Sequence, residues 1–125
     1  MHIVCGTDII EITRIENAIK NLGDNFKNKI YTQKEIEYCE SKNKMKYQHY
    51  AGRFAAKEAI YKALSNLLTE KFEISWKNAE ILNDEKGKPY VNFIDTDIFE
   101  KIHNIDISIS HCVEYAIAYT VIIYE

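Results

Sequence analysis

The sequence has 125 residues, 46% of them hydrophobic and 28% charged, which is the ordinary balance of a globular domain. This balance excludes a disordered chain, a collagen-like repeat and a disulfide scaffold, and the length predicts one domain over residues 1–125. The longest apolar stretch, residues 115–124, is half as long as the roughly 20 residues of a transmembrane helix. Three cysteines without CxxC spacing predict reduced thiols and a cytoplasmic location.

The net charge of −3 is spread unevenly along the chain. Between Lys42 and Lys62 there are six basic residues and one acidic residue, so this segment carries +5 and the rest of the chain −8. A basic segment in an acidic protein predicts a polyanionic ligand rather than general nucleic-acid binding. The alternative is a solvated helix face whose lysines serve solubility.

The pattern of apolar residues predicts mixed helices and strands. Residues 2–10 are rich in Ile and Val and predict a strand. Apolar residues at three- and four-residue spacing predict an amphipathic helix over 11–22, closed by Gly23. Thr32-Gln33-Lys34-Glu35 is a capping-box sequence, which opens a second helix that ends near residue 39.

The second half of the chain contains more strands than helices. The predicted order is an alanine-rich helix over 50–68, strands over 73–82 and 89–93 joined by a turn at 83–88, a short helix over 96–103, and a strand pair over 105–110 and 115–124. The late strands follow hairpin-like connections. We therefore predict an α+β fold with a small antiparallel sheet packed against helices.

The alanine-rich helix carries the densest motif, from Gly52 to Leu64. Glu58 and Lys62 are one turn apart and share a face of this helix. Alanines at 55, 56 and 59 keep the helix slim, so that another backbone or a ligand can approach closely. The alternative is a plain salt bridge between Glu58 and Lys62 on a core helix.

Asp8 interrupts an apolar strand, where a carboxylate is costly to bury unless it is paired or binds a cation. Together with Glu58 it offers two carboxylates for Mg²⁺, which keeps several waters and takes further ligands from its substrate. The alternative is that Asp8 or Thr7 caps the following helix.

The segment from Asp106 to His111 alternates polar and apolar residues. Strand geometry places Asp106, Ser108 and Ser110 on one face and the two isoleucines on the other. Ser110 and His111 are not a nucleophile–base pair, because neighbouring strand side chains point to opposite faces. They can still present a hydroxyl and an imidazole to a ligand, or His111 can simply be solvated.

Three segments in this order resemble holo-acyl-carrier-protein synthase, the small 4′-phosphopantetheinyl transferase family. They are Gly6-Thr7-Asp8-Ile9-Ile10-Glu11, Arg53-Phe54-Ala55-Ala56-Lys57-Glu58-Ala59 and Ser108-Ile109-Ser110-His111. The likeness covers essentially the whole chain, including Tyr31-Thr32-Gln33-Lys34-Glu35 and Gly87-Lys88-Pro89. It implies transfer of 4′-phosphopantetheine from coenzyme A to a serine of apo-acyl carrier protein, which releases adenosine 3′,5′-bisphosphate.

The resemblance also implies roles for individual residues. Asp8 and Glu58 would hold Mg²⁺ on the coenzyme A pyrophosphate, and Lys62 would neutralise charge there or assist deprotonation of the serine. The 3′-phosphate and nucleotide would be bound by a second set of residues, namely Arg53, Lys44, Lys46, Ser110 and His111. Arg14 and Lys20 on the first helix would dock the carrier protein.

The family's homotrimer is a further implication. Arg53 and Glu58 are five residues apart, which rotates them by about 140° and separates them by about 7.5 Å along a helix. They can hardly clamp one compact phosphate centre from a single chain, so we expect sites between subunits of a ring.

Two departures bear on the activity. The family's Gly-Thr-Gly turn is replaced by Ser65-Asn66-Leu67, so we expect the helix to continue past Leu64. The first helix also carries few basic residues, which predicts weaker docking or a contribution from Lys27 and Lys29. A non-catalytic protein that binds coenzyme A or a carrier protein is therefore the alternative. An unrelated Mg²⁺-dependent phosphohydrolase would leave the likeness at Ser110 and His111 unexplained.

Overall fold

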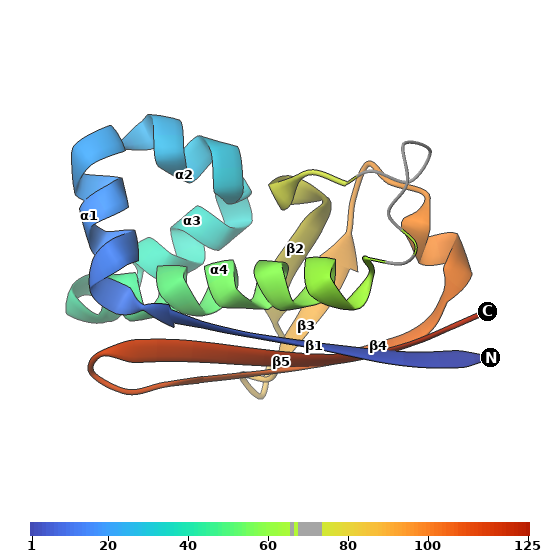
Figure 1. The fold of residues 1–125 in the computed structure, drawn as a ribbon. Helices are drawn as coiled ribbons and strands as arrows, with labels where there is room; N and C mark the ends of the chain where they lie inside the picture. The colour runs from blue at the N-terminus through green and yellow to red at the C-terminus, as the bar shows by residue number, and fades with distance from the viewer. Residues whose placement is uncertain (66, 68–73) are drawn as a thin grey trace.

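The computed structural model describes residues 1–65, 67 and 74–125 (Figure 1). Its principal elements are, in chain order, β1 (His2–Glu11), α1 (Ile12–Leu22), α2 (Asp24–Ile30), α3 (Gln33–Glu40), α4 (Lys46–Ala63), β2 (Ala79–Asn83), β3 (Pro89–Phe93), β4 (Ile102–His111) and β5 (Tyr115–Tyr124). Short 3₁₀ turns η1 (Asn43–Met45), η3 (Trp76–Asn78) and η4 (Ile98–Lys101) precede α4, β2 and β4. Among the described helices, none is long and apolar enough to cross a membrane.

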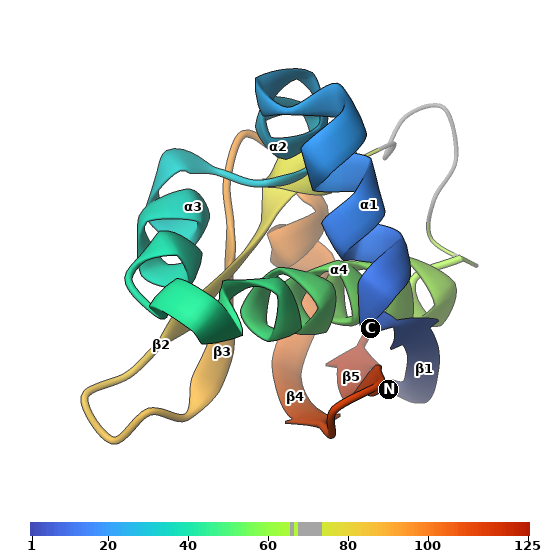
Figure 2. The same ribbon diagram turned by 90° about the vertical axis from the view of Figure 1, so that its left-hand side faces the viewer.

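The strands form two antiparallel sheets. The larger sheet has the order β1-β5-β4, and β2 pairs with β3 in a separate hairpin. Helix α4 lies along one face of the larger sheet, while α1, α2 and α3 gather near its N-terminal end (Figures 1 and 2). The predicted α+β fold with small antiparallel sheets and helices is therefore confirmed.

The small residues of α4 allow it to approach β1 closely. Ala55, Ala56 and Ala59 are buried in the core between the helix and the sheet. A Cβ atom added to Gly6 would lie 2.0 Å from the carbonyl oxygen of Ala59, so β1 passes α4 where no side chain fits. This contact fixes the position of the neighbouring Asp8 relative to α4.

A buried ion pair fixes the orientation of α4 from its other side. Lys57 Nζ lies 2.9 Å from Glu35 Oε1, and both side chains have 0% exposure. The ammonium also donates to the carbonyl oxygens of Trp76 and Ala79. Glu35 accepts from Thr32 N in the predicted capping box, and from Ile81 N, so every group of the pair is hydrogen-bonded.

The N-terminal half of the chain agrees with the sequence prediction at β1, α1 and α3. Gly23 ends α1 with a positive φ of 57°, and its N–H donates to the Ile19 carbonyl, as its position predicted. Helix α2 was not predicted. The proposal that Asp8 or Thr7 caps α1 is wrong, because both lie within β1 and the residue before the helix is Glu11.

Four predicted boundaries are also wrong. Helix α4 begins at Lys46 rather than near residue 50, and it ends at Ala63. Leu64 and Ser65 form a turn, so the helix does not continue there; residues 66 and 68 lie outside the described residues. Strand β2 begins at Ala79 because η3 precedes it, and the short helix predicted over 96–103 is only η4, followed directly by β4.

Candidate active site

Asp8, Glu58 and Lys62 form one cluster between β1 and the last turns of α4. Lys62 Nζ lies 2.9 Å from Asp8 Oδ1 and 3.1 Å from the Thr7 carbonyl oxygen. The Lys62 side chain is 53% exposed and that of Asp8 only 15%, so the lysine covers the carboxylate from the solvent side. The ion pair of Lys62 is thus with Asp8, across the fold, and not a plain pair with Glu58 one turn earlier.

The electrostatics of this cluster favour a cation. Burial, and then the charge of nearby Asp8, raise the pKa of Glu58 above its ordinary value, while Lys62 opposes the shift. Two carboxylates that repel one another are stabilised when a divalent cation lies between them. Within the described part of the chain there is no group of three or more His, Cys, Asp and Glu ligands, so such a cation would need further ligands from a substrate.

Arg53 lies in a second, separate cluster on the N-terminal half of α4. It is only 3% exposed, its guanidinium carbon lies 4.0 Å from the centre of the Tyr38 ring, and it donates to Asn83 Oδ1. Its Nε atom is buried and has no hydrogen-bond partner among the residues that the structure describes. A buried guanidinium with an unused donor is suited to bind an anion.

The Arg53 cluster lines a cavity of about 160 Å³. Its walls are Tyr38, His49, Arg53, Asn83, Gly87, Pro89, Ile109 and His111. The cavity thus brings together Arg53 and His111, as predicted, and none of Asp8, Glu58 and Lys62 lines it. Within one chain the two clusters are therefore separate.

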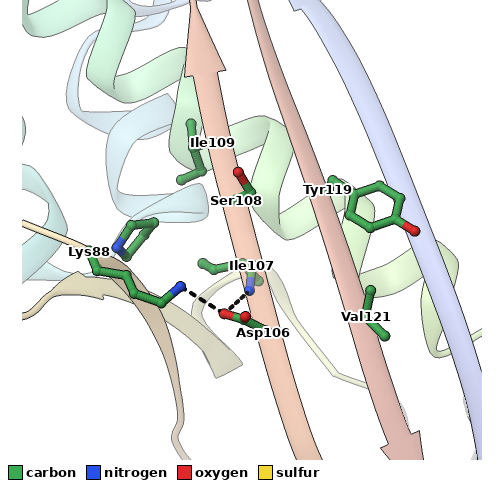
Figure 3. Close-up of a pocket in the computed structure, with 8 residues that line it drawn as sticks. Lys88, Asp106, Ile107, Ser108, Ile109, Tyr119 and Val121 are labelled. Atoms are coloured by element: carbon green, nitrogen blue, oxygen red, sulfur yellow. Dashed lines mark hydrogen bonds and ion pairs between the residues drawn. The ribbon is translucent and has the colours of Figure 1, made fainter.

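A second hollow, of about 380 Å³, lies beside this cavity and shares Pro89 and Ile109 with it. Figure 3 shows Ser108 and Tyr119 on the open side of the sheet, with the Lys88 ammonium extending towards Asp106. Lys88 Nζ lies 2.8 Å from Asp106 Oδ1, and this contact is the main reason why the pKa of Asp106 is lowered. The alternation predicted for this strand is confirmed by the exposed Asp106 and Ser108 and the buried Ile107.

The other predicted nucleotide-binding residues lie in different surroundings. Lys44 is exposed in η1, and Lys46 lies 3.4 Å from Glu40, which already matches its charge. Ser110 lines another hollow, on the open sheet face with Ile9 and Ile117, rather than the cavity of Arg53. Of the predicted set, His111 therefore lines the cavity with Arg53 and also the hollow with Ser110, while Lys44 and Lys46 line neither.

The structure adds residues that the motifs did not indicate. Lys42 Nζ lies 4.7 Å from the centre of the Tyr38 ring, on which Arg53 also packs. His49 packs against both Tyr38 and His111. The basic character of residues 42–62 was the only sequence signal for this group, because Tyr38, Asn83 and His111 reach it from other elements.

The two predicted docking residues lie on α1 and differ in their surroundings. Arg14 is exposed. Lys20 is also exposed, but its ammonium lies 2.6 Å from Glu16. Of the other two lysines considered, Lys27 lies 3.5 Å from Glu40 and Lys29 is exposed on α2.

The sequence of this chain is similar to a known protein family. A family model described as the 4′-phosphopantetheinyl transferase superfamily matches residues 4–120. The holo-[acyl-carrier-protein] synthase of Ruminiclostridium cellulolyticum is 46% identical over 126 aligned positions, which cover 98% of this chain and 92% of that protein. The chain belongs to the holo-[acyl-carrier-protein] synthase family of this superfamily.

Solved structures of the family agree with this assignment. A holo-[acyl-carrier-protein] synthase from Bacillus anthracis, in complex with CoA (3′,5′-ADP), is 34% identical with a TM-score of 0.77, over 95% of this chain and 94% of that one. The Helicobacter pylori synthase in complex with coenzyme A is 32% identical with a TM-score of 0.80, over 94% and 98% of the two chains. The resemblance seen in the sequence motifs is therefore confirmed.

Proposed function

We propose that this chain, as one phosphopantetheinyl transferase domain, transfers 4′-phosphopantetheine from coenzyme A to a serine of apo-acyl carrier protein. The observation that carries the proposal is the presence of two complementary clusters on one fold. A carboxylate–lysine cluster lies at Asp8. A cationic cavity lies at Arg53, whose Nε donor is unused among the described residues. Relatives with CoA bound share this fold.

The reaction is a displacement at phosphorus. The serine Oγ forms a bond to the phosphorus that carries pantetheine, and the bond from that phosphorus to the bridging oxygen breaks. The serine proton passes to solvent, and adenosine 3′,5′-bisphosphate leaves with the bridging oxygen. Positioning and charge stabilisation supply most of the catalysis in such transfers.

The Asp8 cluster would act on the pyrophosphate. Lys62, which is exposed and already held near Asp8, would neutralise charge that accumulates there or assist removal of the serine proton. Asp8 and Glu58 would hold Mg²⁺, since two mutually repelling carboxylates fit a divalent cation. When bound, this ion supplies positive charge on the phosphate oxygens.

The Arg53 cluster would bind the nucleotide end of coenzyme A. Arg53 and His111 supply donors for the 3′-phosphate, and exposed Lys44 would add its charge. Lys46 would contribute less because it is already near Glu40. Ser110 lies on the other face of β4, so it would serve a nucleotide only at a surface completed by another subunit.

We propose a homotrimer with the sites between subunits. The sheet face opposite α4 exposes large apolar side chains, namely Ile3, Ile9, Tyr115, Ile117 and Tyr119. The register places Ile9 of β1 beside Ile117 of β5, and Tyr115 and Tyr119 follow on the same face of β5, so these four side chains form an apolar patch. Such a patch on a soluble chain is typical of a protein interface. A closed ring would bring the Asp8 cluster of one subunit to the Arg53 cluster of the next.

The carrier protein and the compartment follow from the same proposal. Arg14 and, more weakly, Lys20 would dock an acidic carrier protein, since the charge of Lys20 is already matched by Glu16. Cys5, Cys39 and Cys112 are free thiols, which suits a reducing cytoplasm.

The alternative of a non-catalytic binding protein rested on the missing glycine-rich turn. The chain nevertheless leaves the helix at Leu64 without a glycine, and Asp8, Glu58 and Lys62 lie together. The transferase is therefore the better supported function.

Mass spectrometry of an apo-acyl carrier protein incubated with the protein, coenzyme A and Mg²⁺ tests the proposal. We expect the carrier to gain the mass of one phosphopantetheine group, and a carrier with its acceptor serine changed to alanine to gain none. The Asp8→Asn variant should be nearly inactive at limiting Mg²⁺. If the carrier proteins of the source organism all remain unmodified, the chain is not a transferase.

A further inference from the structure

Positive groups crowd around one aromatic ring in the Arg53 cavity. Arg53 and Lys42 lie 4.0 and 4.7 Å from the centre of the Tyr38 ring, and the His49 ring packs against its edge at a centroid distance of 5.5 Å. In residues 1–65, 67 and 74–125, no group accepts a hydrogen bond from Arg53 Nε. The cavity thus gathers the charges and the unused donor that suit an anion.

His49 is the imidazole most affected by this crowding. Arg53 from its own helix, His111 from β4 and Lys42 from the turn after α3 all act on it, and Tyr38 of α3 lies against its ring. Within the described part of the chain, no carboxylate is among the groups that act on it. Burial, followed by these three cationic or titratable neighbours, lowers the pKa of His49 to about 4.

We propose that His49 couples binding of the nucleotide phosphate to uptake of a proton. In the free protein His49 is neutral; when a phosphate dianion enters the cavity, the imidazole accepts one proton from solvent and becomes a charged donor to that phosphate. No other bond forms or breaks. The inference rests on the proposed function, because it takes the 3′-phosphate of coenzyme A as the anion in this cavity.

The physical reason is the sign of the field at His49. In the free protein its neighbours Arg53 and Lys42 carry positive charge, which disfavours a further charge on the imidazole. A phosphate dianion reverses that field and stabilises imidazolium through a charge-assisted hydrogen bond. His49 and Arg53 line the same cavity, so an anion bound there by Arg53 acts on the imidazole as well.

The proton uptake then determines how the affinity for the phosphate changes with pH. A group whose pKa rises on binding takes up protons between its free and bound pKa values, so affinity increases as pH falls through that range. If binding restores the ordinary imidazole pKa of about 6.5, the contribution of His49 to affinity is about fourfold at pH 6 and negligible at pH 8.

Isothermal titration calorimetry with adenosine 3′,5′-bisphosphate measures this proton uptake directly. Titrations of the full-length protein at pH 6, in two buffers of different ionisation enthalpy, give the number of protons exchanged. The phosphate itself titrates near pH 6, so the informative quantity is the difference between the wild-type protein and the His49→Phe variant. Phenylalanine retains a ring against Tyr38 and removes the titrating nitrogens.

We expect the wild-type protein to take up about three quarters of a proton more than His49→Phe at pH 6, and the affinities to converge at pH 8. Adenosine 5′-phosphate, which lacks the 3′-phosphate, should show no such difference. A His49→Gln variant, which keeps a hydrogen-bonding side chain without titrating in this range, should behave as His49→Phe does; it also replaces that variant if phenylalanine prevents folding.

The possible results separate the two proposals. Equal proton uptake by the wild-type protein and both variants overturns the role of His49, and uptake lost only in His111→Phe assigns it to His111 instead. Tight binding of the bisphosphate without His49-dependent uptake leaves the proposed function intact. Absence of any bisphosphate binding overturns both proposals together.

Discussion

The fold makes the ionised form of the Glu58 carboxyl group less favourable. Its pKa is raised by burial and by Asp8, so the ionised form is less stable in the folded chain than in the unfolded chain. A raised carboxyl pKa means that stability falls as pH rises through the folded pKa. This cost at neutral pH is consistent with a site arranged for a cation rather than for stability.

We therefore predict that Glu58→Gln stabilises the metal-free protein at pH 7 and leaves its stability unchanged near pH 3. The same variant should lose most of its transferase activity, because a neutral amide is a poor Mg²⁺ ligand. Thermal unfolding at both pH values, with and without Mg²⁺, measures the effect.

Added Mg²⁺ should raise the melting temperature of the wild-type protein more than that of Glu58→Gln. A lower melting temperature for metal-free Glu58→Gln at pH 7 would show that Glu58 is a stabilising structural residue. Glu85→Gln, which removes an exposed carboxylate in the turn between β2 and β3, is the control for a general effect of surface charge.

Helix α4 contributes residues both to the hydrophobic core and to the two clusters of the candidate site. The Lys57 side chain is buried against Glu35. On the same helix, Lys62 contacts Asp8 and Arg53 lines the cavity. Removing one partner of a buried pair leaves the other charge uncompensated, which costs about 3–5 kcal/mol. The pair therefore holds α4 in the orientation on which both clusters depend.

We predict that Lys57→Met lowers the free energy of unfolding by about 3–5 kcal/mol and that adding Glu35→Gln recovers part of that loss. Urea unfolding of the single and double variants forms a double-mutant cycle. Simple additivity of the two losses would mean that the charges do not compensate one another. Lys77→Met, on exposed η3, should change stability by less than about 0.5 kcal/mol.

The exposed face of α1 carries the prediction for the carrier protein. Arg14→Glu should raise the KM for an acidic carrier about tenfold at low salt, and the loss should shrink as salt is added. Lys20→Glu should have a smaller effect, because Lys20 is already paired with Glu16. Steady-state kinetics at two salt concentrations measure these KM values. Lys77→Glu, the same charge reversal at an exposed position on η3, is the control. Equal effects of all three variants would remove α1 from the docking surface.

The elements that the sequence predicted well are those with local signals. The capping box at Thr32 and Glu35 and the glycine at the end of α1 act within a few residues, and both are present. Helix α4 begins at Lys46 without a side-chain cap, so no local signal marks its start. Strand β2 begins after η3, where Lys57 binds the carbonyl oxygens on either side, a contact made across the fold.

The candidate site shows the same division. The two carboxylates and Lys62 were predictable, because their motifs are specific and their contact follows from the crossing of β1 and α4. The position of His49 was not predictable, since it depends on Tyr38 and His111 from two other elements. The basic segment indicated an anion but could not indicate which of its residues would meet.

For the whole molecule, the separation of the two clusters is the feature on which the proposed homotrimer rests. The cavity of Arg53 includes none of Asp8, Glu58 and Lys62, and the open sheet face exposes large apolar side chains such as Ile9 and Ile117. The proposed head-to-tail ring would use one interface repeatedly and complete each site from two subunits. Sedimentation should accordingly show a trimer, which an Ile117→Asp substitution in the patch should dissociate.

Mixing inactive variants tests whether each site is shared between chains. Asp8→Ala removes the carboxylate half, and Arg53→Gln removes the guanidinium of the nucleotide half while keeping a donor for Asn83. In randomly mixed rings about a quarter of the interfaces join two intact halves, so co-refolded chains should recover about that fraction of wild-type activity. Asp8→Ala mixed with Glu58→Ala is the control; it should recover nothing, because both changes damage the same half. If the first mixture also stays inactive although mass spectrometry shows mixed rings, each site is built within one chain.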